Sequence, residues 1–147
     1  MQTHSEEQAR LKEFKKLFKG KPILLVDDDP HWIKAMHMLL DTLGASVNCA
    51  PNGEKAVQYL RLARYDIILL DIQMPGIDGW DLYAIMQQVR PGRDLPVYFL
   101  TGLPAPLQTK FVAKLPVSPE RVLQKSLSPW EILATISKEL LEPEQAA

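Results

Sequence analysis

Three consecutive carboxylates, Asp27, Asp28 and Asp29, follow an apolar run in the sequence ILLVDDDP, and no lysine or arginine adjoins them. A fourth carboxylate, Asp71, ends a second apolar run in YDIILLDIQMPGIDG. Two carboxylates about 4 Å apart repel by roughly 4 kcal/mol at an effective dielectric constant of 20. If the fold brings them together, the site therefore needs either a raised pKa or a cation. Oxygen ligands at a partly open site suit Mg²⁺, so the sequence predicts a magnesium site.

Apolar runs of strand length recur along the chain and are separated by segments of helix length. Ile23–Val26, Ile67–Leu70 and Val97–Leu100 are uniformly apolar, as buried parallel strands are. Ala45–Ala50 and Arg121–Gln124 are less apolar, which favours positions at the edges of a sheet. The pattern predicts an α/β fold with a doubly wound, five-stranded parallel sheet in the flavodoxin-like order 2-1-3-4-5.

Helix starts are marked by residues that cap the first turn. Asp29, Asn52 and Asp78 each precede an amphipathic segment, and Ser128 opens the capping box SPWE. The region from 102 to 120 contains four prolines around one short helical pattern, LQTKFVAKL. We therefore expect a shortened or irregular helix there.

In this topology the chain reverses between strands 1 and 3, and ligands bind beside the carboxyl ends of those strands. Asp27, Asp28 and Asp71 should meet there, and Thr101 and Lys125 end strands 4 and 5 at the same edge. Taken singly, a DD pair is more often a solvated loop, a strand-end threonine bonds its own loop, and a loop lysine is solvated. Together they favour phosphoryl transfer, which requires charge neutralisation, positioned donors and a nucleophile, here Asp71.

The stretches ILLVDDDP, YDIILLDIQMPGIDG, LPVYFLTG and LQKSLSPWEIL resemble, in order and spacing, the receiver domain of bacterial two-component response regulators. The resemblance covers residues 22 to about 141. It implies that Asp71 accepts a phosphoryl group from the phosphohistidine of a histidine kinase or a histidine phosphotransfer protein. The chain would then be a regulatory phosphoacceptor that assists its own phosphorylation and dephosphorylation, and not an enzyme with a separate substrate.

The resemblance also implies roles for the other residues at the site. Mg²⁺ would be held by Asp28, Asp71 and the backbone carbonyl of Gln73, with Asp27 assisting through water. Thr101 would bond a phosphoryl oxygen, and Lys125 would pair with the phosphate.

Two positions depart from the pattern of receiver domains. Ser126 replaces the proline that usually follows the lysine through a cis bond; a cis bond before a residue other than proline costs ~3 kcal/mol, so we expect a trans bond and an altered lysine loop. Val122 replaces the tyrosine or phenylalanine that usually stands three residues before the lysine. The aromatic switch residue of the family is thus absent.

Composition limits the partners. The 147-residue chain has a formal net charge of −1, which offers no overall attraction to nucleic acid or to an anionic membrane. A single cysteine, Cys49, excludes an intrachain disulfide, and no apolar run approaches the ~20 residues that span a bilayer. These features favour a soluble cytoplasmic protein that binds neither nucleic acid nor membrane directly.

We expect three segments: a basic amphipathic and helical extension over 1–21, a receiver domain over 22–141, and a short tail over 142–147. In the extension, Leu11, Phe14 and Phe18 share one helical face. This pattern favours a helix docked on its own domain or on a neighbouring molecule over a specific partner or a membrane surface. No output domain is recognisable. Output is therefore expected through contacts with an unidentified downstream protein, or through a homodimer.

Two classes of function remain open. The preferred one is a stand-alone phosphoacceptor switch in a phosphorelay. The other is a receiver-like adaptor whose contacts ignore phosphate, which Ser126, Val122 and the proline-rich region favour. An aspartyl-phosphate phosphatase would place its nucleophile at strand 1 and carry insertions that the chain lacks, and no glycine-rich phosphate loop is present.

Overall fold

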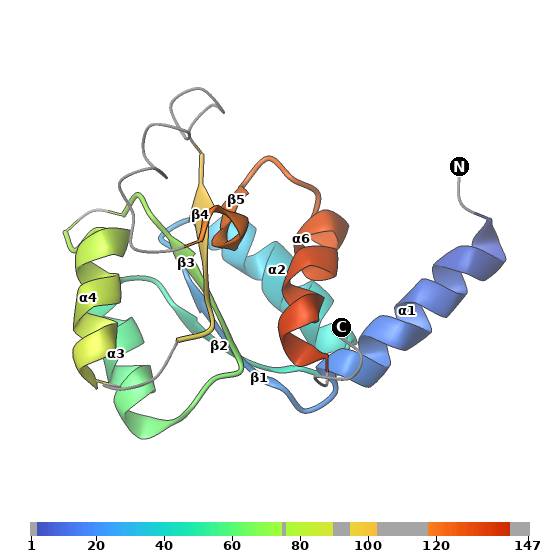
Figure 1. Cartoon of the computed structure of the whole chain (residues 1–147), viewed down its shortest axis with the longest axis horizontal. Helices are drawn as coiled ribbons and strands as arrows, with labels where there is room; N and C mark the ends of the chain where they lie inside the picture. Colours follow the sequence, from blue (N-terminus) through green and yellow to red (C-terminus); the bar gives the residue numbers. More distant parts are fainter. Residues whose placement is uncertain (1–2, 75, 90–94, 103–117, 142–147) are drawn as a thin grey trace.

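The structure, a computed structural model, describes residues 3–74, 76–89, 95–102 and 118–141. Its centre is a five-stranded parallel sheet in the order β2-β1-β3-β4-β5 (Figure 1). The strands are β1 (Pro22–Val26), β2 (Ser46–Ala50), β3 (Ile67–Asp71), β4 (Val97–Thr101) and β5 (Val122–Gln124). The predicted order is confirmed, including the two weakly apolar strands at the edges.

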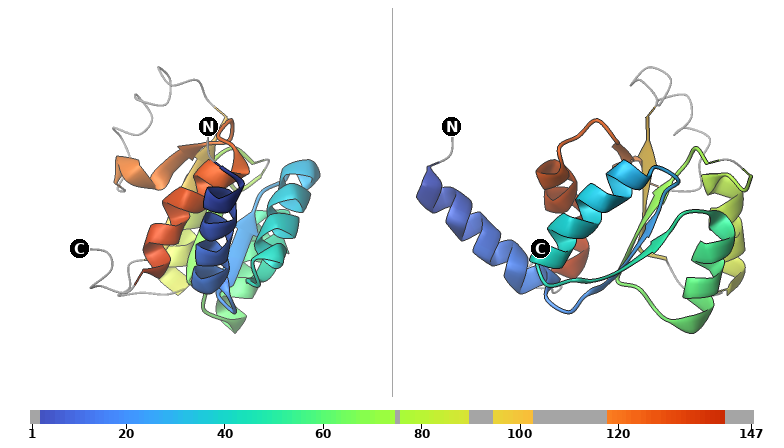
Figure 2. Two further views of the ribbon diagram at one scale, coloured as in Figure 1. Left: turned by 90° about the vertical axis from the view of Figure 1, so that its right-hand side faces the viewer. Right: turned by 180° about the vertical axis from the view of Figure 1, so that it is seen from behind.

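Helices cover both faces of the sheet. The described helices are α1 (His4–Phe18), α2 (Pro30–Thr42), α3 (Gly53–Leu62), α4 (Gly79–Val89) and α6 (Pro129–Ile136), with the 3₁₀ turns η1 (Pro119–Arg121) and η2 (Ser137–Leu140). Figures 1 and 2 show α3 and α4 on one face, and α2 and α6 on the other. None of the described helices is both long enough and apolar enough to cross a bilayer.

The cap residues form the bonds that the sequence predicts. Asp29 Oδ1 accepts from the backbone N–H groups of His31 and Trp32, at 3.0 and 3.3 Å. Ser128 and Glu131 bond reciprocally as a capping box. Because these bonds satisfy N–H groups that lack partners inside the helix, they determine where α2 and α6 begin.

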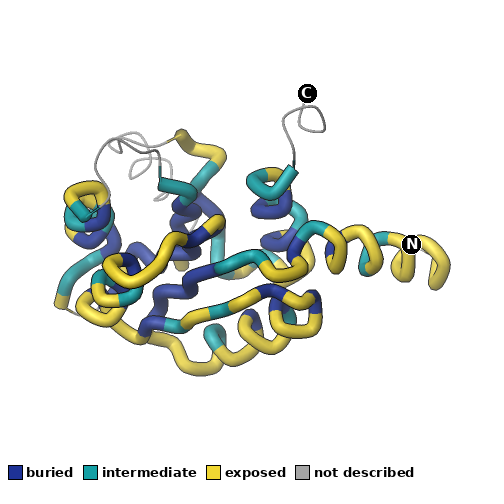
Figure 3. Tube along the Cα trace, turned by 90° about the horizontal axis from the view of Figure 1, so that it is seen from below, coloured by how far each residue is buried: buried dark blue, intermediate teal, exposed yellow. Residues whose placement is uncertain are grey.

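Two apolar clusters form the core, one on each face of the sheet. Along β1, Ile23 and Leu25 join the cluster beneath α1, α2 and α6, whereas Leu24 and Val26 join the cluster beneath α3 and α4. This alternation follows from the two-residue repeat of a strand. Apart from Pro22, every residue of the three inner strands is buried, and the middle of the molecule is accordingly dark blue in Figure 3. These strands hold the carboxyl-end loops in place.

The N-terminal segment forms the helix α1, and its last turns enter the core. Phe18 is fully buried and Phe14 nearly so, and the ring of Phe14 stacks on Trp130 of α6 at 5.9 Å between centroids. The first turns of α1 are exposed and project from the domain (Figures 1 and 3). The predicted boundary between a 1–21 extension and a 22–141 domain stays a prediction, although these contacts join α1 to the same core.

The start of the last strand differs from the sequence expectation. Arg121, expected in the last strand, belongs to η1, because its N–H donates to Ser118 O at 3.0 Å and closes a tight turn. Its guanidinium lies over the ring of Tyr98 and pairs with Glu139 of η2. The helix expected within 102–120 and the tail 142–147 lie largely outside the described residues.

Candidate functional site

Asp27 and Asp71 are buried at the carboxyl ends of neighbouring strands. The register pairs Val26 with Leu70, so the residues that follow each of them, Asp27 and Asp71, emerge at the same edge of the sheet. Asp27 is fully buried and Asp71 is 3% exposed. Asp27 Oδ1 accepts from the backbone N–H of Asp29 at 2.9 Å, and Asp71 Oδ1 accepts from that of Gln73 at 3.1 Å. The backbone thereby fixes both carboxyl groups.

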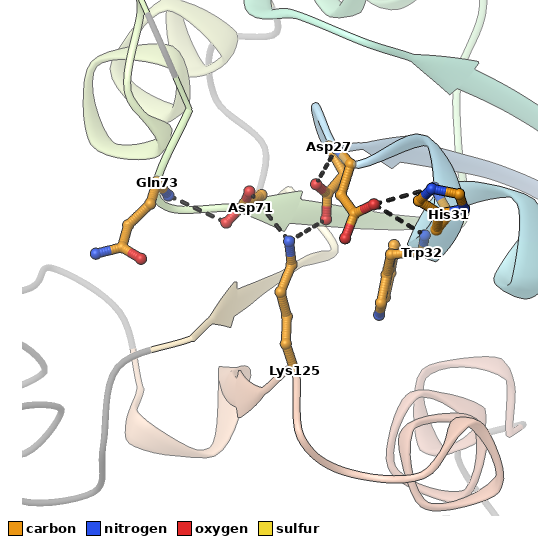
Figure 4. Close-up of polar contacts among 7 residues, drawn as sticks. Asp27, His31, Trp32, Asp71, Gln73 and Lys125 are labelled. Carbon is orange, nitrogen blue, oxygen red and sulfur yellow. Dashed lines mark hydrogen bonds and ion pairs between the residues drawn. The ribbon is translucent and has the colours of Figure 1, made fainter.

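Lys125 brings the positive charge that the sequence lacks near the acidic run. Its Nζ lies 2.7 Å from Asp27 Oδ2 and 3.3 Å from Asp71 Oδ2 (Figure 4). The main chain supports this reach, because the N–H of Lys125 donates to Thr101 O at 2.9 Å. One ammonium thus bridges two buried carboxylates.

The pKa values of the site follow from burial and from these charges. Burial and, after it, the negative charge of Asp27 raise the pKa of Asp71 to about 6, although the hydrogen bond from Gln73 and the charge and hydrogen bond of Lys125 act in the opposite direction. Burial lowers the pKa of Lys125, but the hydrogen bond and charge of Asp27, and then Asp71, raise it above its ordinary value. Lys125 therefore stays charged, and Asp71 holds its proton more tightly than a solvated aspartate.

Asp28 completes an acidic cluster. It is exposed at the rim, and one carboxylate oxygen from each of Asp27, Asp28 and Asp71 lies within 4.8 Å of the others. Three carboxylates face one ammonium, so the cluster keeps an excess of negative charge. The donors are all oxygen atoms and one is solvent-accessible, which is the ligand set that Mg²⁺ takes while keeping waters in its shell. These residues fit a magnesium ion.

The close approach of α4 supports the loop that carries Asp71. Gly79, the first residue of α4, donates its N–H to Ile72 O at 2.9 Å. A Cβ atom at this position would lie 2.6 Å from Ile72 Cα and 2.7 Å from Asp71 O. Only glycine lets the helix start this close to the end of β3 without moving the backbone.

The remaining predicted residues lie at the same edge. Thr101 is buried at the end of β4, one residue past the position that pairs with Asp71. Gln73 is exposed, and its backbone N–H donates to Asp71. The role of its carbonyl as a metal ligand stays a prediction.

The described residues contain no cis peptide bond, so Ser126 follows Lys125 through a trans bond and the lysine still reaches both carboxylates. Val122 is buried in β5.

Sequence reasoning missed Trp32. Its ring lies beside the site, with the centroid 5.8 Å from Lys125 Nζ (Figure 4). The available signal was its place in the first turn of the helix that Asp29 caps, directly after the acidic run. Nothing in the sequence places Lys125 beneath this ring.

Comparison with known proteins identifies the family of this chain. The family model of the response regulator receiver domain matches residues 23–137, most of the chain. The chain belongs to the response regulator receiver family. A crystal structure of a CheY-like receiver domain protein from Methanospirillum hungatei superposes with a TM-score of 0.70 at 23% identity, covering 88% of this chain and 100% of that one. That likeness supports the receiver fold.

Two of the relatives are longer proteins that match this chain over part of their length. A probable transcriptional regulator, ycf27 of Cyanidium caldarium, is 35% identical over 114 residues, which are 78% of this chain and 44% of that protein. The sensor histidine kinase GacS of Pseudomonas protegens is 34% identical over 83 residues, which are 54% of this chain and 9% of the kinase. The chain thus spans less than half of each, and the similarity concerns the receiver domain.

Proposed function

We propose that the chain is a phosphoacceptor switch of a two-component phosphorelay, in which Asp71 takes a phosphoryl group from a phosphohistidine. The observation that carries this proposal is the position of Asp71: buried at the end of β3, with its pKa raised to about 6, and 3.3 Å from the ammonium of Lys125. A carboxylate of this kind is ionised at neutral pH and is more basic than a solvated one, which favours it as a nucleophile.

In the proposed reaction, a carboxylate oxygen of Asp71 attacks the phosphorus atom of the phosphohistidine. An O–P bond forms, the N–P bond breaks, and its electron pair stays on the imidazole nitrogen, which is then protonated. Asp27, Asp28 and Asp71 would hold Mg²⁺, which neutralises the charge of the phosphoryl oxygens when bound. Lys125 would pair with a phosphoryl oxygen, and the Thr101 hydroxyl would donate to another.

A histidine kinase or a histidine phosphotransfer protein is the proposed donor. Membership of the receiver family supports this choice, as does the similarity to a segment of a sensor histidine kinase. The proposed output is contact with a downstream protein or with a second copy of the chain.

The test is phosphorylation with radiolabelled acetyl phosphate, a small phosphoryl donor, in the presence of Mg²⁺. Wild type should acquire acid-stable, base-labile label, and Asp71→Asn should acquire none while keeping its circular dichroism spectrum. Asp66→Asn, which removes an exposed carboxylate just before β3, is the matched control and should label like wild type.

The outcomes separate the two classes of function. Label on Asp71→Asn would remove Asp71 from the role of acceptor. A wild type that binds Mg²⁺ but never acquires label would instead support the receiver-like adaptor, whose contacts are independent of phosphate.

A further inference from the structure

The main-chain bonds around Lys125 do not by themselves fix the position of its ammonium group. Backbone bonds to Thr101 O and between Leu127 and Gln124 fix the loop. The ammonium, however, stands at the end of a flexible four-carbon side chain, and confining that chain is entropically unfavourable. Ser126, next in sequence, is exposed and contacts Gln124 through its hydroxyl. The contacts at the ammonium end must therefore do the positioning.

Trp32 supplies one such contact from a different element. It lies in the first turn of α2, where its backbone N–H donates to Asp29 Oδ1, and its partly buried ring packs against the apolar cluster on that face. The apolar cluster therefore holds the ring, while the backbone bond fixes the helix start that carries it. Its centroid lies 5.8 Å from Lys125 Nζ, within the ~6 Å at which an ammonium is attracted to an aromatic face. Indole is the strongest of the aromatic side chains in this role.

We propose that Trp32 is the positioning residue for Lys125, holding its ammonium over the pair formed by Asp27 and Asp71. This inference rests on the proposed function. The carboxylates attract the ammonium at 2.7 and 3.3 Å, and the indole attracts it as a third partner, from α2. When a phosphoryl group forms on Asp71, the anionic partners change but the indole does not. Trp32 thereby keeps Lys125 at the site through both states.

The test compares two substitutions. Trp32→Leu keeps an apolar side chain but removes the aromatic face, whereas Trp32→Phe keeps an aromatic face. The measurement is binding of beryllofluoride, a stable stand-in for the phosphoryl group, at saturating Mg²⁺. We expect about fivefold weaker binding for Trp32→Leu and a change below about twofold for Trp32→Phe, the size of one partly buried cation–π contact.

A double-substitution cycle separates positioning from general damage to the site. In the background Lys125→Ala, the change Trp32→Leu should leave beryllofluoride binding unaltered, because the group it positions is gone. The affinity of Trp32→Leu for Mg²⁺ alone should stay within about twofold of the wild-type affinity, because the proposed mechanism gives Trp32 no part in holding the metal. An equal loss in both backgrounds, or a parallel loss of Mg²⁺ binding, would overturn the inference.

A spectroscopic signature needs no substitution at Trp32. The ε-methylene protons of Lys125 should resonate upfield of the other lysines in wild type, because they lie beside the indole ring; Lys125→Ala identifies the signal. An ordinary chemical shift there would refute the contact.

A wild type that binds no beryllofluoride would refute the proposed function, and the inference with it, whereas a normal response in Trp32→Leu would refute the inference alone.

Discussion

Replacing the proposed phosphoacceptor should make the metal-free protein more stable. Asp71 is 3% exposed, and its pKa is raised from 3.8 to about 6 by burial and by the charge of Asp27. The folded protein thus binds this proton more tightly than the unfolded chain does. The resulting stabilisation is fully present below about pH 3.8 and is lost as the pH rises through about 6. At pH 7.5 the ionised carboxylate opposes folding.

The magnitude follows from the two pKa values. Because one pH unit corresponds to 1.36 kcal/mol, the difference between 3.8 and about 6 is worth about 3 kcal/mol. Asparagine has similar size and no charge. The free energy of unfolding of Asp71→Asn at pH 7.5 should therefore exceed that of wild type by up to about 3 kcal/mol. The free energies of the two proteins should converge near pH 4.

The assay is urea unfolding of both proteins from pH 4 to pH 8 in a chelator, so that no divalent cation relieves the repulsion. Asp41→Asn, an exposed carboxylate at the far end of α2, is the control and should follow the wild-type curve. If Asp71→Asn is no more stable than wild type at pH 7.5, or if its advantage does not change with pH, the repulsion inferred from the structure is wrong.

Metal binding, core packing and the start of α4 can each be tested by a further experiment. Mg²⁺ at a hundredfold excess over its dissociation constant should stabilise wild type by about 2.7 kcal/mol. It should stabilise Asp71→Asn by clearly less, and thermal melting of both proteins measures the difference. Phe18→Ala should cost about 3–5 kcal/mol in urea unfolding because the ring is fully buried, whereas Leu62→Ala, at a side chain 84% exposed, should cost little. Gly79→Ala should weaken Mg²⁺ binding by displacing the end of β3. Gly102→Ala should not, because among the described residues, its chain neighbours aside, no atom lies within 4 Å of the added Cβ.

Much of this fold could be predicted because its signals are local. The apolar runs mark the three inner strands, and the cap residues mark where α2, α3 and α6 begin. The order of the strands then follows from which runs are most apolar, since a strand covered on both faces has no polar side. The convergence of Asp27, Asp71 and Lys125 is a consequence of that order.

What the sequence could not supply is the detail set by tertiary packing. The contact between Trp32 and Lys125 joins residues 93 positions apart, and no periodicity reports it. At the step from η1 into β5, the guanidinium of Arg121 contacts Tyr98 and Glu139, which lie on other elements and are far from it in the sequence. The need for glycine at 79 appears only when the backbone of Ile72 is in place.

On the proposed function, the balance of charge predicts that the site needs a cation more after phosphorylation than before it. In the structure, Lys125 Nζ lies closer to Asp27 than to Asp71, so its charge is already engaged by a carboxylate that is not the proposed acceptor. A phosphoryl group on Asp71 would replace one negative charge with about −1.5 to −2. One lysine, held by Trp32, cannot balance that charge and Asp27 and Asp28 together. Repulsion among the carboxylates destabilises the metal-free fold. On the proposed function, relief of that repulsion favours the binding of Mg²⁺, and bound Mg²⁺ in turn makes phosphorylation of Asp71 possible.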